Sequence, residues 1–314
     1  MPTLDSDGEV TTPWLAAGDG PDAIALDRTA LLTWPDAPWA ALAGAQGSVD
    51  ASAGLESGIA LTRYASGKQV EGKDVFNIDI VFQGIWTPAL QQALVSAVAV
   101  SERMIVEGVQ DVRYNGQLID DIIVTAELKS IDGLGGVLGR AGPTAVRTAN
   151  ALPVTASMQF DAADAFRMSP DLWADVILHE MFHCLGFGSL WDRFTVKGAP
   201  IVKLLDGKNW IYVGPAALAQ FNALSPDDGI MSHIPLENTG GAGTQGSHWR
   251  ESVFSDELMT GYLHNVDAIL STITAAATTC ISQSTPTPAG VAPGNVVAAP
   301  SVSIRMSGTN DNAR

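Results

Sequence analysis

The residues best suited to chemistry form one short motif, H-E-x-x-H, made by His179, Glu180 and His183. Residues four apart lie on one face of a helix, so the two imidazoles could bind a single metal ion. The glutamate between them could then act as general base toward a water molecule on that ion. Zinc is the metal typical of this motif. We therefore expect one catalytic Zn2+ ion, with His179 and His183 as ligands and Glu180 as the catalytic residue.

The sequence before the motif predicts the helix that must position it. Ser169 is a suitable N-cap, and Pro170 suits the first helical position. Leu172 and Val176 continue an apolar spacing of three to four residues toward the histidines. Gly186 follows where a chain that leaves a helix often needs a left-handed residue, so we expect it to support the site. The alternative is a pair of partly buried histidines satisfied by backbone groups.

A third zinc ligand has to come from outside the motif, because a catalytic zinc usually has three protein ligands. In the compact metzincin pattern H-E-x-x-H-x-x-G-x-x-H this ligand would be residue 189, which is Ser189. Asp192 is close along the chain and could coordinate the zinc through a carboxylate oxygen. Glu237 lies in a stretch rich in Pro, Asn and Gly, unlike a helix. The remaining histidines are His233, His248 and His264, and spacing alone does not choose among these alternatives.

Three blocks of the sequence carry a resemblance to a known family. They are the run from His179 to Gly188, the block Gly246-Ser247-His248-Trp249 after a long insert, and the block Glu257-Leu258-Met259. Together they resemble the leishmanolysin family of zinc metalloendopeptidases, in particular its bacterial relatives. Weaker similarity extends over roughly residues 72 to 280. The resemblance implies proteins or peptides as substrates.

The resemblance also completes the predicted site. It implies that His248 is the third zinc ligand and that Glu257-Leu258-Met259 is a Met-turn, with Met259 beneath the metal. A thioether is a poor partner for zinc beside three imidazoles, so Met259 is expected to shape the floor of the site. A plain core methionine would occupy the same position. Tyr262 could donate to an oxyanion or simply pack, and His233 and His264 receive no role.

Patterns along the chain predict an α+β fold. Residues 76–82 and 122–128 alternate as strands do, and between them Pro88 opens an amphipathic stretch of about five helical turns. The resemblance implies a metzincin-like peptidase with an N-terminal mixed sheet and two long helices, the second of which carries the zinc motif. It implies a C-terminal lobe with few regular elements. Residues 156–161 should form an edge strand that could take up an extended substrate or meet only water.

The composition predicts the division of the chain. Residues 1–71, rich in Ala, Gly, Asp and Pro, are interpreted as an extension or pro-segment. Residues 72–283 would be the catalytic domain, with an upper lobe (72–188) and a lower lobe (189–283). Residues 284–314 would be a low-complexity tail. Both cysteines, Cys184 and Cys280, follow the first ligands, so no inhibitory cysteine is expected from the N-terminal side; whether they form a disulfide stays open.

The charge and the apolar content limit the partners. The chain has 34 acidic and 17 basic residues and a formal charge of −17, which disfavours nucleic acid. No run of eighteen apolar residues predicts a transmembrane segment, and the first thirty residues do not resemble an ordinary signal peptide. The family resemblance nevertheless favours an extracellular or cell-surface location, reached by another export route.

The sequence thus predicts hydrolysis of peptide bonds by a zinc-activated water, with Glu180 as general base. Two other functions are considered. The first is a catalytically inactive, zinc-stabilised binding or adhesion module, which would have no need for the carboxylate of Glu180. The second is a metal-dependent hydrolase that acts on a non-peptide amide.

Overall fold

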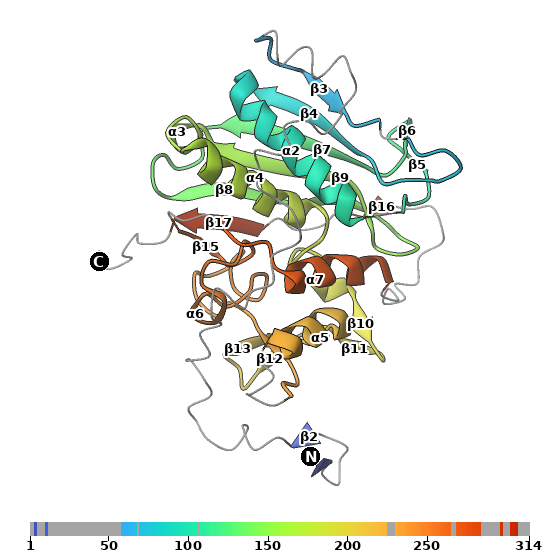
Figure 1. Ribbon diagram of the computed structural model, residues 1–314, viewed down its shortest axis with the longest axis vertical. Helices are drawn as coiled ribbons and strands as arrows, with labels where there is room; N and C mark the ends of the chain where they lie inside the picture. Colours follow the sequence, from blue (N-terminus) through green and yellow to red (C-terminus); the bar gives the residue numbers. More distant parts are fainter. Residues whose placement is uncertain are drawn as a thin grey trace.

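The structure is a computed structural model that describes residues 58–67, 69–105, 107–224, 230–264 and 268–283 (Figure 1). Outside these ranges it describes four short strands, namely Thr3–Leu4 (β1), Val10–Thr11 (β2), Val296–Val297 (β16) and Val302–Met306 (β17). The predicted extension over residues 1–71 therefore lies largely outside the described residues.

One mixed sheet of eight strands dominates the upper half of the molecule in Figure 1. Its order is β15-β17-β8-β9-β7-β4-β3, and β16 pairs separately with β8. The further strands are Arg63–Ala65 (β3), Ile78–Gly84 (β4), Ile122–Lys129 (β7), Val137–Arg147 (β8), Pro153–Asp161 (β9) and Tyr262–Leu263 (β15). Strands β4, β7 and β9 run parallel, whereas β8 is antiparallel to β9. The predicted mixed α+β fold is confirmed at this level.

Alternating burial explains why the central strands form. In β4 the side chains of Ile78 and Ile80 are fully buried, while Asp79 between them is half-buried. Strand β7 repeats this pattern along its whole length, as does most of β9. Each strand therefore presents one apolar face to a common core.

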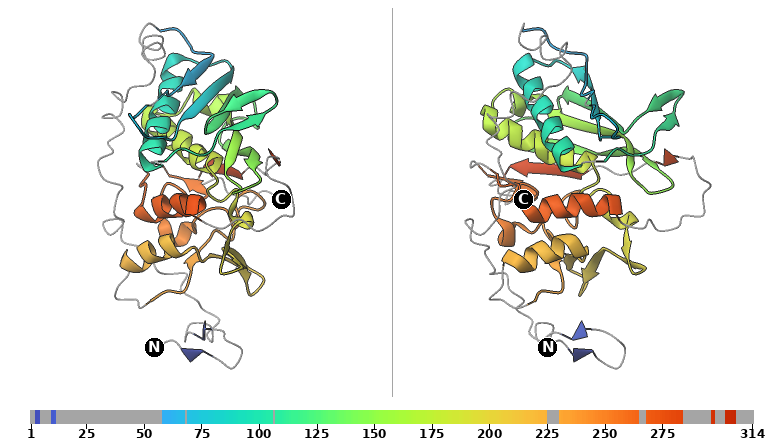
Figure 2. Two further views of the ribbon diagram at one scale, coloured as in Figure 1. Left: turned by 90° about the vertical axis from the view of Figure 1, so that its right-hand side faces the viewer. Right: turned by 45° about the vertical axis from the view of Figure 1, so that its right-hand side comes forward.

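Two long helices, Pro88–Met104 (α2) and Pro170–Cys184 (α4), pack against each other on one face of this sheet (Figures 1 and 2). Each begins with a hydroxyl cap and a proline. The Thr87 hydroxyl accepts a hydrogen bond from the Leu90 amide, and the Ser169 hydroxyl accepts one from the Leu172 amide. The Trp173 indole then donates to the carbonyl of Leu90, at 3.0 Å, and ties α4 to α2.

Residues 189–283 contain shorter elements, most of which lie below the sheet in Figure 1. We call these residues the lower half of the molecule, and residues 58–188 the upper half. The helices of the lower half are Trp191–Arg193 (η3), Pro215–Leu224 (α5), Glu251–Phe254 (α6) and Thr272–Gln283 (α7), and α5 packs on α7. Its strands outside the main sheet are Thr195–Val196 (β10), Ala199–Pro200 (β11), Val202–Leu205 (β12), Asn209–Tyr212 (β13) and Ile234–Pro235 (β14). The upper half also contains β5 (Val112–Tyr114), β6 (Gln117–Ile119) and α3 (Ala162–Ala165). No helix of the described residues is long and apolar enough to cross a bilayer.

The prediction that residues 156–161 form an edge strand is wrong. They belong to β9, which pairs with β7 on one side and with β8 on the other. The sequence does not predict β8 as the outer neighbour, because Gly139, Gly142 and Pro143 weaken its strand pattern. Strand β8 therefore lies outside β9, and its other side pairs in turn with β17 and β16.

The sheet also includes strands that lie before and after the predicted catalytic range, 72–283, in the sequence. Strand β3 precedes this range, and β17 follows it. Residues 302–306 pair with β8, although the composition of residues 284–314 is typical of a linker. Backbone pairing with a distant strand leaves no local signal in such a sequence.

Candidate metal centre

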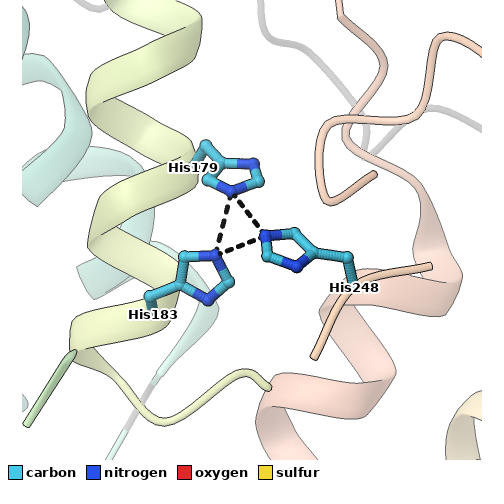
Figure 3. A group of neighbouring side chains, drawn as sticks. All are labelled: His179, His183 and His248. Carbon is cyan, nitrogen blue, oxygen red and sulfur yellow. Dashed lines mark hydrogen bonds between the residues drawn. The ribbon is translucent and has the colours of Figure 1, made fainter. Parts of the chain in front are cut away.

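Three imidazoles meet at one point, two from α4 and one from the segment between β14 and α6 (Figure 3). The Nε2 atoms of His179 and His183 are 2.9 Å apart. The Nε2 atom of His248 lies 3.2 Å from the first and 3.0 Å from the second. All three side chains are fully buried. His179 and His183, one helical turn apart on α4, thus meet His248, which lies 65 residues after His183.

In each ring, a hydrogen bond at Nδ1 leaves Nε2 as the nitrogen that faces the other two rings. The Nδ1 atoms of His179 and His183 lie 2.7 Å and 2.8 Å from the carbonyl oxygens of Leu258 and Phe187. That of His248 lies 3.0 Å from the carbonyl oxygen of Thr244. A carbonyl can only accept, so each Nδ1 carries the proton and donates it. Each Nε2 atom then directs a lone pair toward the other two.

Three lone pairs about 3 Å apart cannot form hydrogen bonds with one another, because none of these Nε2 atoms carries a proton. A cation at their centre removes the repulsion. Tetrahedral zinc with Zn–N distances of about 2.0–2.1 Å separates its nitrogen ligands by roughly 3.3 Å. The three observed separations of 2.9, 3.0 and 3.2 Å are close to that value. The donor set and its spacing therefore fit zinc.

Burial also keeps the imidazoles neutral, as metal binding requires. It lowers the pKa values of His179 and His183 well below their ordinary range, with a further contribution from the neighbouring rings. Burial lowers the pKa of His248 to about 4. At neutral pH protons therefore compete weakly with a metal ion for these nitrogens.

A tight turn after α4 orients the ring of His183. Gly186 and Gly188 have φ angles of 109° and 66°, a region that favours glycine. Between them, Phe187 presents its carbonyl oxygen to His183 Nδ1. A Cβ on Gly188 would lie 2.0 Å from the carbonyl oxygen of Ser247, next to His248. This turn therefore allows the backbone to approach the segment that carries the third imidazole.

The segment around Met259 orients the ring of His179. The carbonyl of Leu258 accepts from His179 Nδ1, and the amide of Met259 donates to the buried carboxyl group of Glu257 at 2.6 Å. The hydroxyls of Ser271 and Thr274 also donate to Glu257. This carboxyl group connects the turn to the start of α7. Met259 itself is fully buried.

His248 is held by a loop with little regular structure. Its carbonyl accepts from the amide of Glu237 at 2.9 Å, and its Nδ1 also contacts the hydroxyl of Ser247 at 3.1 Å. The next residue, Trp249, is fully buried, and its ring lies 5.2 Å from that of Phe187. The amide of Trp249 donates to the carbonyl of Met259 at 3.0 Å. The loop is thus anchored to both segments that orient the other two histidines.

Glu180 is buried on α4 beside the imidazoles. A Cβ built on Gly139 would lie 2.8 Å from Glu180 Oε1. The carboxylate therefore lies against the backbone of β8, at a position where a larger side chain would collide with it. Sequence reasoning does not single out Gly139, although an isolated glycine in a strand often marks a close approach.

The other candidate residues lie outside the histidine cluster. Asp192 is exposed, and Glu237 uses its carboxylate to accept from the amides of Asn238, Thr239 and Glu251. Ser189 donates to the carbonyl of His183. His233 contacts Ser232, His264 pairs with Glu251, and the Tyr262 hydroxyl lies 3.1 Å from that of Thr239. Cys184 is buried, and its thiol faces the carbonyl of Ser157.

A cavity of about 770 Å³ lies elsewhere on the molecule, and no member of the cluster lines it. Its walls include Asp74, Asp79 and Asp121. Burial raises the pKa of Asp121 to about 6. This carboxylate accepts from the amides of Asn77 and Val109, so it has a clear structural role.

An H-E-x-x-H helix joined by a third imidazole from a remote loop defines a centre of the zinc-peptidase type. The family model described as leishmanolysin matches residues 92–281, so the chain belongs to the leishmanolysin family of zinc metallopeptidases. A leishmanolysin homolog of Crithidia fasciculata is 29% identical to the chain over 128 residues. This match covers 40% of the chain and 19% of the homolog, so the matched region is about a fifth of the homolog's length.

Proposed function

We propose that this protein is a zinc-dependent metalloendopeptidase that hydrolyses peptide bonds in proteins. The main support is the convergence of three buried Nε2 atoms whose rings are each fixed through Nδ1. His179, His183 and His248 would hold one zinc ion. Membership of the leishmanolysin family supports both the metal and the reaction class.

The proposed mechanism assigns the proton transfers to Glu180. Zinc, when bound, supplies a Lewis acid that polarises the scissile carbonyl and lowers the pKa of the attacking water. Glu180 accepts the proton of this water and delivers it to the leaving amine. The carboxylate extends from the same helix as two of the ligands and lies against β8, so its position is restricted on both sides. No covalent acyl-enzyme forms.

The finer structural assignments are part of the proposal. Leu258 and Met259 would form a Met-turn of the metzincin type, in which Met259 shapes the floor of the site and does not coordinate. The hydrogen bond between His179 and the carbonyl of Leu258 supports a turn beside the proposed ligands. The catalytic domain would span 72–283, with its upper and lower lobes meeting at residue 188.

Proteins or peptides would be the substrates, and an extracellular or cell-surface location is proposed from the family. The alternative is a catalytically inactive module that uses zinc only for stability. A structural zinc usually closes its coordination with a fourth protein ligand. Among the described His, Cys, Asp and Glu side chains, the group that could share one ion contains three histidines. A group of three protein ligands favours the enzyme over the inactive module, because a catalytic zinc leaves its fourth position to water.

A protein-digestion assay tests the proposal. The zinc-loaded protein should cleave casein, a chelator should stop the cleavage, and added zinc should restore it. The Glu180→Gln variant should bind one equivalent of zinc but should not cleave casein. His233→Ala is the matched control, since His233 lies outside the cluster, and it should retain the parent rate. Zinc binding without cleavage in the parent would favour the inactive module, whereas turnover of small amides alone would favour the non-peptide hydrolase.

A further inference from the structure

Strand β17 lies along the outer edge of β8, next to the metal centre. Its residues Val302–Met306 run antiparallel to β8, with Ile304 opposite Gly139. Gly139 is the residue whose absent side chain makes room for the Glu180 carboxylate. Residue 304 is therefore one strand spacing away from the backbone against which the proposed general base lies.

The second edge of β17 faces the lower half of the molecule. It pairs in parallel with β15, and the partners are Tyr262 with Arg305 and Leu263 with Met306. Strand β15 begins three residues after Met259, in the segment whose Leu258 carbonyl binds His179. Figure 1 shows β17 between β8 above and β15 below. Both edges of this short strand thus pair with segments that build the site.

An extended polypeptide can bind a sheet edge through main-chain hydrogen bonds, whatever its side chains are. An edge that already pairs with one strand cannot accept another. Strand β8 is paired by β9 on its inner side, and between residues 137 and 141 its outer side is paired by β17. The part of β8 next to Glu180 is therefore occupied on both sides.

We propose that Val302–Met306 occupies the place of an extended polypeptide substrate and competes with substrate for the edges of β8 and β15. This inference rests on the proposed peptidase function, since it takes these edges as the substrate-binding ones. Because the segment is tethered, it acts at a high effective concentration. It need not bind strongly to hold the edge in the absence of substrate, and substrate displaces it when present in excess.

Proline substitutions in the full chain test the competition. Successive residues of an antiparallel strand direct their amides to opposite sides, so Ser303→Pro combined with Ile304→Pro removes one amide donor from each side of β17, including the side that pairs with β8. This double variant should lower KM for a protein substrate several-fold and leave kcat unchanged. Thr309→Pro, outside β17, is the control and should match the parent. An unchanged KM in a folded, zinc-loaded double variant would overturn the inference.

A peptide of residues 301–308 provides a measurement that needs no variant of the tail. Added to the parent, it should inhibit competitively with respect to substrate, whereas a scrambled peptide should not. No inhibition at millimolar peptide would count against the inference.

A binding measurement separates this inference from the proposed function. Zinc-loaded Glu180→Ala protein should bind the fluorescently labelled peptide more tightly, by several-fold, when it also carries the two prolines. If this difference is observed but no variant cleaves protein, the occupancy by β17 stands and the peptidase proposal fails. If protein is cleaved but peptide binding is the same with and without the prolines, the occupancy fails and the peptidase proposal stands.

Discussion

The two halves of the molecule contribute to the site in different ways. In the upper half, one regular helix supplies His179, Glu180 and His183, and helical geometry alone places them together. In the lower half, His248 comes from a loop that is held by the contacts of the next residue, Trp249, with Met259 and with the more distant Phe187. A helix thus positions two of the proposed ligands locally, whereas the third proposed ligand requires the whole lower half to be assembled.

This contrast predicts different consequences of damage in each half. We expect that a change on α4 can remove the chemistry while the metal stays bound, because the proposed base and two of the proposed ligands are separate residues on one helix. Damage to the lower half should weaken metal binding, since the carbonyls that orient His179 and His248 belong to Leu258 and Thr244. The following tests run from the largest expected effect to the smallest.

The sharpest contrast is between Glu180→Ala and His248→Ala. The first should lower casein cleavage by about 10⁴-fold while the protein keeps one zinc, because only the proton acceptor is lost. The second should lose zinc and activity together, since two imidazoles hold zinc poorly. Metal analysis and an activity assay on the same samples distinguish them. Parent-rate cleavage by Glu180→Ala would show that the base is wrongly assigned.

The buried carboxyl group of Glu257 should be the most sensitive point of the lower half. Glu257→Ala removes the acceptor for the Met259 amide and for the hydroxyls of Ser271 and Thr274. We expect a loss of about 3–5 kcal/mol in the free energy of unfolding, together with weaker zinc binding. Urea denaturation and zinc titration measure both.

The control for that experiment is Glu127→Ala in the upper half. Glu127 is half-buried and pairs with Lys129 at 2.9 Å. Its loss should change the free energy of unfolding by about 1 kcal/mol or less and leave zinc binding unchanged. Equal effects of the two substitutions would contradict the special role of Glu257.

The contact between the two halves is tested at Gly188. Gly188→Ala places a Cβ 2.0 Å from the carbonyl oxygen of Ser247, so the loop that carries His248 must shift. Gly198→Ala is a matched control, because Gly198 has a similar positive φ of 81° and a Cβ there meets no atom within 4 Å. We expect Gly188→Ala to cost about 2–3 kcal/mol more than its control and to weaken zinc binding. Equal thermal unfolding temperatures for the two variants would refute this contact.

The pH dependence of the metal-free protein should give the smallest effect. Since the folded pKa of His248 is lowered to about 4, the unfolded chain binds more protons between that pH and its ordinary pKa near 6.5. Stability should therefore fall as the pH drops through this window. Between pH 7 and pH 5 the parent should lose about 2 kcal/mol more than His248→Asn. Parallel stability curves would show that this imidazole is not held neutral by the fold.

Local patterns in the sequence predict the upper half well. The strands at residues 78–84 and 122–129 and both long helices follow from alternation, caps and apolar spacing. Strand β8 is missed because its glycines and its proline weaken the strand pattern, and one of these glycines, Gly139, lies against the carboxylate of Glu180.

The third imidazole is a different case. Spacing left Asp192, Glu237 and three histidines open, and only the resemblance to leishmanolysin selected His248. The contacts that join it to the two histidines of α4 link residues 65 and 69 positions apart, for which a single sequence has no local signal. The pairing of β17 with β8 is longer in range still, and no sequence pattern indicates it.

The central claim is that three imidazoles, two from one helix and one from a distant loop, hold a single zinc ion. Anomalous diffraction from crystals of the zinc-loaded protein, measured on both sides of the zinc absorption edge, tests it most directly. We predict one zinc peak at about 2.0–2.1 Å from the Nε2 atoms of His179, His183 and His248. A peak bound to other residues, or to the two helix histidines without His248, would contradict the account.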